Sequence, residues 1–317
     1  MLLNVLLSIV GFVLLIKCAD FFVSGAASFA GNFKIPTVVI GLTIVAFGTS
    51  APELAISFNS HLTDNTDMLF GNVIGSNIAN ILLILGLAVL IKPFKIHSDV
   101  TKKEMPVLLL VTLGFSALLL DSLFDFGAVN TLTRSDGVVL ILFFTVFIYY
   151  LIAILKNKDK NSTEDKPKYK VFTSVIMILV GLLGIVFGSD LVVNNVASFA
   201  SSIGISQKII AVTVISIGTS LPELVTTVTA AKKGENGMAI GNIIGSNIFN
   251  ICIVIGLPVV ILGEVSTMLF NIVDIAFMLL AVALLWLFAA TGRELRRYEA
   301  CMLIGAYCLY GVYIFVQ

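Results

Sequence analysis

The chain has 317 residues, of which 58% are apolar and only 12% are charged. An ordinary soluble domain carries about a quarter charged residues, so this composition excludes that class and indicates an integral membrane protein. The 19 basic and 19 acidic residues cancel, so no basic field argues for a nucleic-acid partner. No protein partner is implied, and the expected surroundings are a lipid bilayer.

Long uncharged stretches predict ten membrane-spanning helices, because a helix needs about 20 mostly apolar residues to cross the hydrocarbon layer. The chain enters the first stretch without a basic leader, so we expect a span there and not a removed signal peptide. The four cysteines lie in apolar stretches and are expected to be core residues. The predicted spans are residues 2–28, 36–60, 68–91, 105–121, 136–155, 171–198, 208–231, 237–262, 271–291 and 299–316.

The basic residues predict which loops face the cytoplasm. With ten spans, 16 of the 19 basic residues fall in loops on one side, six of them in the polar loop 156–170. An excess of Lys and Arg marks the cytoplasmic side. We therefore expect a multi-pass protein of the cell (plasma or inner) membrane with both termini extracytoplasmic.

The chain repeats itself after a shift of 170 residues. "GTSAPEL" at 48–54 returns as "GTSLPEL" at 218–224, and "GNVIGSNIAN" at 71–80 returns as "GNIIGSNIFN" at 241–250. Each repeat holds five predicted spans, and because five is odd the second repeat must enter the membrane from the opposite side. Inverted repeats with polar breaks at matching places are typical of secondary transporters.

The expected fold class is therefore all-α and integral to the membrane, with ten helices in two inverted-topology five-helix repeats around an ion site at the midplane. The expected divisions are a first repeat at 1–155, a cytoplasmic linker at 156–170 and a second repeat at 171–317.

The repeated strings predict breaks in spans 2 and 7. Gly48 and Pro52 are poor residues for a helix interior, and Pro52 also lacks the N–H that the helix would use. We expect the carbonyls from Ala46 to Thr49, and those from Ser216 to Thr219, to lose their helical partners and to line a polar cavity. Spans 3 and 8 are expected to be broken as well.

Glu53 and Glu223 indicate what this cavity holds. A carboxylate in the middle of a membrane is costly, and no basic residue shares these spans near the glutamates. Protons or bound cations must therefore supply the compensating charge. Carboxylates, hydroxyls and carbonyls are oxygen ligands, which suit a hard cation such as Ca2+. The further lining residues expected are Thr49, Ser50, Ser76, Asn80, Thr219, Ser220, Ser246 and Asn250.

Other repeated polar residues are expected to act outside the ion site. Asp20 and Asp190 lie towards the ends of spans 1 and 6 and favour a structural or gating role. Lys17 is expected to reach the interface or to pair with Asp20. Four asparagines are expected to form hydrogen bonds between helices, namely Asn72, Asn77, Asn242 and Asn247.

These strings resemble the two alpha-repeats of the calcium/cation antiporter superfamily, the sodium/calcium exchangers and their prokaryotic relatives. The resemblance covers nearly the whole chain, and four motif blocks in this order make it specific. It implies that Ca2+ and Na+ are transported substrates, that no cofactor is needed, and that Glu53 and Glu223 bind Ca2+. It also implies a role for backbone carbonyls at Ala46, Thr49, Ser216 and Thr219.

One position departs from the pattern. Several members of the family carry an aspartate where this chain has Asn250, so the expected site holds two acids and not three. Two glutamates still neutralise one Ca2+. The departure leaves open how many sodium ions bind and whether protons or potassium take part.

The expected function is a secondary antiporter, not an enzyme, that exchanges Na+ for Ca2+ by alternating access and moves Ca2+ outward. Two ionised glutamates need compensating cations when the site is closed from water. Either Ca2+ or Na+ can neutralise them, so the two ions compete for the same oxygens. A proton-coupled exchanger of Ca2+ or another divalent cation is the alternative. An intramembrane hydrolase or a cation channel is more remote, because acid and base need unlike environments and channel rings usually come from several subunits.

Overall fold

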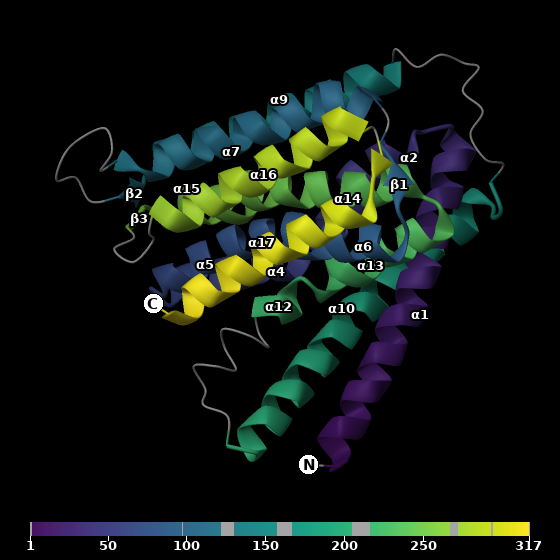
Figure 1. Ribbon diagram of the computed structural model, residues 1–317, viewed down its shortest axis with the longest axis horizontal. Helices are drawn as coiled ribbons and strands as arrows, with labels where there is room; N and C mark the ends of the chain where they lie inside the picture. The colour runs from purple at the N-terminus through teal and green to yellow at the C-terminus, as the bar shows by residue number, and fades with distance from the viewer. Residues whose placement is uncertain are drawn as a thin grey trace.

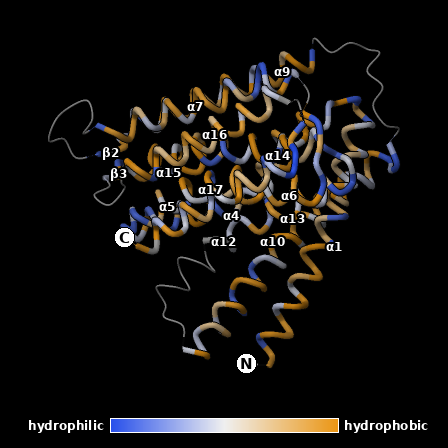
Figure 2. The backbone as a smooth tube through the Cα atoms, viewed as in Figure 1, coloured by the Kyte–Doolittle hydropathy of each residue, from blue (hydrophilic) through white to orange (hydrophobic). Residues whose placement is uncertain are grey.

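The computed structural model describes residues 2–96, 98–121, 130–156, 167–204, 216–266, 272–292 and 294–316, and it is built almost entirely of helices (Figure 1). Six of the described helices are long and apolar enough to cross a membrane, or seven if one bent pair is a single span. Apolar residues run along these helices (Figure 2). The chain is thus an all-helical, multi-pass membrane protein.

The first sequence repeat begins with α1 (Leu2–Phe33), a helix of 32 residues. The remaining elements of this repeat are α2 (Thr37–Ile40), the π-helical segment η1 (Gly41–Val45), α3 (Ala46–Thr49), α4 (Ala51–Leu62), α5 (Thr66–Ile78), the π-helical η2 (Ala79–Leu85), α6 (Gly86–Ile91), β1 (Phe94–Lys95), the π-helical η3 (Val100–Glu104), α7 (Met105–Leu119), β2 (Thr131–Leu132) and α9 (Arg134–Lys156).

The second sequence repeat begins with another helix of 32 residues, α10 (Val171–Ser202). It continues with α12 (Ser216–Thr219), α13 (Leu221–Lys233), α14 (Asn236–Phe249), the π-helical η5 (Asn250–Ile255), α15 (Gly256–Leu262), β3 (Val265–Ser266), α16 (Ile272–Gly292), β4 (Glu294–Leu295) and α17 (Arg297–Val316). Residues 208–215, the start of the predicted span 7, lie outside the described part of the chain. So do residues 157–166, most of the predicted linker.

The helices α1 and α10 lie side by side and are inclined to the other helices of the bundle (Figure 1). Glycines let their backbones touch. A Cβ atom on Gly181 would lie 2.8 Å from the Phe22 backbone, and one on Gly11 would lie 3.1 Å from the Gly188 carbonyl oxygen. Small residues at such crossings allow the close packing that joins helices within a membrane.

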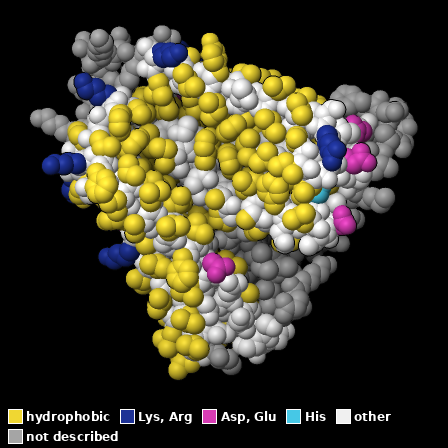
Figure 3. All heavy atoms as spheres, turned by 180° about the vertical axis from the view of Figure 1, so that it is seen from behind, with side chains coloured by type: hydrophobic (Ala, Val, Ile, Leu, Met, Phe, Trp, Pro, Cys, Tyr) yellow, Lys and Arg dark blue, Asp and Glu magenta, His cyan; other side chains and the backbone are white. Residues whose placement is uncertain are grey.

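The helices that carry the GN-x-IGSN strings are the most deeply buried. Of the most apolar 18-residue stretch of each helix, 72% is buried in Thr66–Ile91 and 78% in Asn236–Leu262, against 17% in Arg134–Lys156. Apolar side chains cover much of one outer face, whereas Lys, Arg, Asp and Glu side chains lie mainly near its edges (Figure 3). The polar strings therefore lie inside a shell of helices whose outer faces are apolar.

Two short strand pairs join the sequence repeats at opposite ends of the bundle (Figure 1). β1 pairs antiparallel with β4, with Phe94 opposite Leu295, and β2 pairs antiparallel with β3, with Leu132 opposite Val265. The loops joined by each pair are loops that the sequence places on the same side of the membrane.

The predicted break in span 2 is confirmed, because the helices Thr37–Thr49 and Ala51–Leu62 meet at an angle of 44°. The equivalent break separates α12 from α13 at Ser220. Proline lies in the first turn of both α4 and α13, where its missing N–H does no harm. Broken spans 3 and 8 were a wrong expectation: each continues as one helix through a π-helical segment, and π-helical turns often occur at functional sites.

Candidate ion-binding site

The two breaks have nearly the same backbone geometry. Ser50 has φ −85° and ψ 9°, and Ser220 has φ −89° and ψ 7°. The prediction that carbonyls before the break lack helical partners is wrong for Ala46, whose oxygen accepts the Ser50 N–H at 3.0 Å. The Gly48 carbonyl also accepts a backbone N–H, because the chain tightens its last turn before Pro52.

The carboxylates of Glu53 and Glu223 are both fully buried, with 0% of each residue exposed. They lie in the first turns of α4 and α13, directly after the breaks. The Ser50 hydroxyl donates to Glu223 Oε1 at 2.9 Å. Both carboxylate oxygens of Glu53 and Oε2 of Glu223 have no hydrogen-bond partner in the protein, so they remain available to a cation.

Buried hydroxyls and a carbonyl join the two repeats around these acids. Thr49 Oγ1 lies 3.3 Å from both Ala46 O and Asn242 Oδ1. The Ser246 hydroxyl donates to Ala46 O at 3.4 Å, while the Ser220 hydroxyl donates to Ser76 Oγ at 3.4 Å. Thr219 ends α12 and is only partly buried. Ser216 begins α12, and its side chain lies outside what the structure describes.

Four asparagines form a reciprocal set of hydrogen bonds between the two innermost helices, and we call them the asparagine quartet: Asn77, Asn80, Asn247 and Asn250. Asn77 and Asn247 each donate to the backbone carbonyl of the other, at 3.3 and 3.1 Å. Asn80 donates to Asn247 Oδ1 at 3.0 Å, and Asn250 donates to Asn77 Oδ1 at 3.2 Å. The amide oxygens of Asn80 and Asn250 are buried without a protein partner.

The quartet lies beside the acids. The segment η5, which begins with Asn250, packs against α4, the helix that carries Glu53. The segment η2, which contains Asn80, packs in the same way against α13, the helix that carries Glu223. The hydrogen-bonding role predicted for Asn77 and Asn247 is therefore confirmed.

A second layer of hydrogen bonds supports the acid-bearing helices. Asn72 donates to the Glu53 carbonyl at 3.0 Å and to Ser57 Oγ at 3.1 Å, and Asn242 donates to Thr227 Oγ1 at 2.8 Å. Sequence reasoning missed Ser57 and Thr227. The signal was present, since a hydroxyl recurs four residues after each glutamate at the repeat distance.

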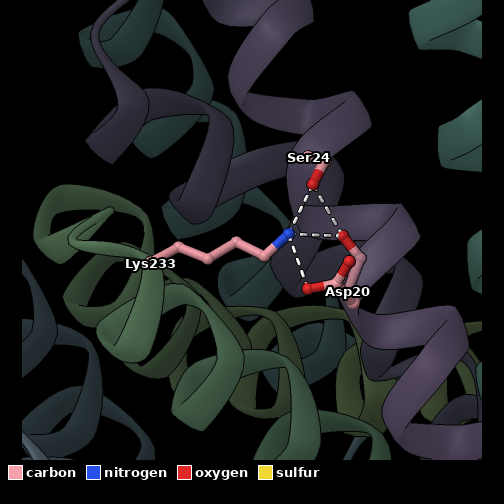
Figure 4. Close-up of polar contacts among 3 residues, drawn as sticks. All are labelled: Asp20, Ser24 and Lys233. Atoms are coloured by element: carbon pink, nitrogen blue, oxygen red, sulfur yellow. Dashed lines mark hydrogen bonds and ion pairs between the residues drawn. The ribbon is translucent and has the colours of Figure 1, made fainter.

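Asp20 pairs with a residue that the sequence did not suggest. Lys233, at the end of α13, lies 2.7 Å from Asp20 Oδ1 and also donates to Asp20 O and to Ser24 Oγ (Figure 4). Of the two alternatives given for Lys17, the pairing with Asp20 is wrong, because Asp20 pairs instead with a lysine of the other repeat that is distant in sequence. Asp190 accepts a hydrogen bond from Asn194 on its own helix at 2.9 Å.

The chemistry of the site is that of oxygen ligands. Within the part of the chain that the structure describes, no group of three or more His, Cys, Asp or Glu side chains could hold a metal ion. No lysine or arginine is buried among the described residues. Two carboxylates with neutral hydroxyl, carbonyl and amide oxygens fit hard cations and do not fit metals that need nitrogen or sulfur ligands.

Comparison with known proteins gives consistent matches over the whole chain. The family model described as "Sodium/calcium exchanger protein" matches residues 3–153 and 173–316. The inner membrane protein YrbG of Escherichia coli is 37% identical over 281 residues, covering 86% of this chain and 84% of the relative.

Two further matches cover nearly the full length. The putative antiporter CaxA of Alkalimonas amylolytica is 36% identical over 325 residues, covering 99% of each protein. A solved structure of the sodium-calcium exchanger NCX_Mj superposes with a TM-score of 0.83 and 31% sequence identity, covering 97% of each chain.

Proposed function

Because this chain belongs to the sodium/calcium exchanger protein family, we propose that it exchanges Na+ for Ca2+ by alternating access and extrudes Ca2+ from the cell. The family is one of transporters and not of enzymes, and its members are antiporters of cations. The proposal therefore concerns which cations move, through which residues and in which direction.

The observation that carries the proposal is the convergence of Glu53 and Glu223. Their carboxylates are fully buried, Ser50 at the start of α4 donates to Glu223, and three of the carboxylate oxygens have no protein partner. In a low-dielectric interior two such charges are very unfavourable unless cations accompany them. The cation ligands proposed are Glu53, Glu223, Thr49, Thr219, Ala46, Ser216, Ser50, Ser220, Ser76, Ser246, Asn80 and Asn250.

Exchange follows from competition for the same oxygens. Ca2+ and Na+ can each compensate the two carboxylates, so one ion species must leave before the other binds. A carrier with uncompensated acids cannot pass through a closed, dry state, which makes the exchange obligatory. Na+ entering the cell would then drive Ca2+ outward.

We propose the ten-span arrangement of two inverted repeats at 1–155 and 171–317, with cytoplasmic loops on the basic side. The strand pairs support it, because β1–β4 and β2–β3 each join loops that this arrangement places on one side. The similarity to an inner membrane protein of Escherichia coli supports a location in the cell membrane.

Transport of radioactive Ca2+ into proteoliposomes tests the proposal. An outward Na+ gradient should drive Ca2+ uptake, and an imposed pH gradient without Na+ should not. Uptake that follows the pH gradient and ignores Na+ would replace the proposal with a proton-coupled exchanger. Uptake without any counter-ion would indicate a channel.

A further inference from the structure

We propose that the chain holds a second binding site, for the headgroup of an anionic phospholipid, in a cavity between α7 and α16 at one end of the bundle. This cavity is separate from the ion site, and its ligand does not depend on which cations are exchanged. Its assignment to the cytoplasmic leaflet rests on the arrangement of spans proposed above.

The cavity has a volume of about 340 Å³. It lies where η3 and the start of α7 pack against the last turns of α16, two helices that lie side by side (Figure 1). This is the end of the bundle where β1 pairs with β4, because η3 follows β1 and α16 leads into β4. Its walls come from both sequence repeats, so a ligand bound there would bridge them.

One wall carries hydrogen-bond donors that the protein leaves without partners. Ser98, Thr101 and Lys102 line the cavity, and spacings of three and four residues place them on one helical face. The Thr101 hydroxyl is buried and has no hydrogen-bond partner. The exposed Lys102 ammonium forms no ion pair with a residue that the structure describes. Such unpartnered donors favour a ligand that supplies acceptor oxygens.

The acids nearby are already bound elsewhere. Asp99 Oδ2 lies 2.9 Å from Lys103 Nζ, and Glu104 accepts from Tyr150 at 2.7 Å. Among the described residues that line the cavity, Lys102 is the charged one and none is a carboxylate. The cavity therefore selects an anion, and phosphate oxygens form strong charge-assisted hydrogen bonds with such donors.

The other wall is apolar and continues along the outer surface of the bundle. Pro106 and Ala290 line the cavity. Leu110, one turn deeper in α7 than Pro106, is 60% exposed, and Leu287, one turn deeper in α16 than Ala290, is 54% exposed. Acyl chains that extend from the cavity would cover these leucines. A soluble phosphate compound would gain nothing from them, so a phospholipid is favoured.

Trp286 places the cavity at the depth of lipid headgroups. It lines the cavity six residues before Gly292, the end of α16, which is about 9 Å along the helix. Tryptophan is enriched at this boundary between hydrocarbon and headgroups. The same end of the bundle carries Lys92, Lys95 and Arg297 beside the β1–β4 pair. In the proposed arrangement this end is cytoplasmic, where anionic lipids gather basic residues.

The fluorescence of Trp286 tests the proposal directly, because it is the only tryptophan of the chain. The protein is reconstituted in phosphatidylcholine vesicles with increasing fractions of phosphatidylglycerol whose acyl chains carry bromine, a contact quencher of tryptophan. Quenching by equally brominated phosphatidylcholine gives the reference. We expect relative binding to favour phosphatidylglycerol by about fivefold or more, the contribution of one lysine near an anionic lipid. Equal quenching by the two lipids would overturn the proposal.

Two adjacent lysines separate a built site from general surface charge. Lys102→Gln should lower the preference by about fivefold, because the cavity loses its cation. The matched control Lys103→Gln removes the same charge one residue away, where Asp99 already offsets it, and should change the preference by about twofold or less. Both lysines are exposed, so both variants should fold. Equal losses in the two variants would contradict a specific site.

Thr101→Val tests the buried hydroxyl, since valine keeps the shape of the side chain. The preference should fall by about threefold or more, because the phosphate loses a charge-assisted hydrogen bond. An unchanged preference would contradict the donor set that defines the site.

Competition separates a lipid from a soluble phosphate compound. Phosphatidylglycerol without bromine should restore the fluorescence, whereas glycerol phosphate in the aqueous phase should not, because it lacks the acyl chains. Recovery with glycerol phosphate would assign the cavity to a soluble anion and overturn the lipid. These measurements need no ion gradient, so a failure of Na+/Ca2+ exchange would leave their result unaffected.

Discussion

The two repeats share their key strings, but equivalent residues make different contacts. Ser50 donates to the carboxylate of Glu223 at 2.9 Å, whereas the equivalent Ser220 lies 3.4 Å from the hydroxyl of Ser76. In the same way, Asp20 of the first repeat pairs with Lys233, and its equivalent Asp190 bonds within its own helix. Closely similar strings thus do not produce a symmetric site.

The same difference extends to the two long helices. α1 packs along α13, whereas α10 makes no comparably extensive contact with α4, although both pairs lie within the described residues. A carrier built of inverted repeats can interchange such arrangements when it alternates between its two open states. Equivalent residues with matching contacts should therefore matter equally in both repeats. Equivalent residues with different contacts should matter in one conformation.

The largest effect is expected from the acids, where the repeats should be equivalent. Glu53→Gln and Glu223→Gln should each lower Na+-driven Ca2+ uptake by about 100-fold or more, because one charge can no longer neutralise a divalent ion. Glu104→Gln is the matched control, since this buried acid has Tyr150 as its partner and lies outside the site. An active double variant of Glu53 and Glu223 would rule out the site.

The two serines at the helix breaks should not be equivalent in their effect on Ca2+ affinity. Ser50→Ala removes a hydrogen bond to a carboxylate, a contact of about 1.5–3 kcal/mol, and should weaken apparent Ca2+ affinity by about tenfold or more. Ser220→Ala removes a longer contact between neutral hydroxyls and should change the affinity by about threefold or less. Equal effects, measured from the Ca2+ dependence of uptake, would show that the functional site is more symmetric than the structure.

The asparagine quartet offers an intermediate test of equivalence. Asn77→Ala and Asn247→Ala each remove the amide oxygen that holds the neighbouring ligand, Asn250 or Asn80. Because the bonds are reciprocal, both variants should lower apparent Ca2+ affinity by a similar factor, about threefold to tenfold for one neutral hydrogen bond. A loss in one variant alone, at equal amounts of folded protein, would contradict the paired role.

The smallest effect is expected at the ion pair between α1 and α13. The Asp20 side chain is 63% exposed, and exposed ion pairs contribute about 0–1 kcal/mol. Asp20→Asn and Lys233→Met should therefore change the maximal exchange rate by about threefold or less, and Asp190→Asn should leave it unchanged. If Asp20→Asn and Asp190→Asn changed the maximal exchange rate equally, the ion pair between Asp20 and Lys233 would have no role in favouring one conformation.

Much of the fold could be predicted because its signals are local. Charged residues mark the ends of helices, so the predicted span 136–155 corresponds to α9 (Arg134–Lys156) and 171–198 to α10 (Val171–Ser202). Proline and glycine disrupt the helical turn in which they occur, so these residues predicted the break in span 2. The count of ten spans stays a prediction, since six or seven of the described helices meet the criteria of length and composition.

The rest depended on contacts between distant residues. The shift of 170 residues relates Asn77 to Asn247, but it does not reveal that the two face each other. Lys233 as the partner of Asp20 could not be read from spacing, because the two residues belong to different repeats. The π-helical segments were missed because no single residue type produces them, unlike a proline break.

The distance along the chain between the partners at the site has a consequence for how the protein is made. Ser50 contacts Glu223, Ser76 contacts Ser220 and Asn80 contacts Asn247 only after most of the second repeat has been synthesised. The first repeat must therefore enter the bilayer with a costly carboxylate whose partners do not yet exist. The ion site is therefore assembled in the last stage of biogenesis. A chain that stopped before residue 220 would hold Glu53 in the membrane without the residues that complete the site.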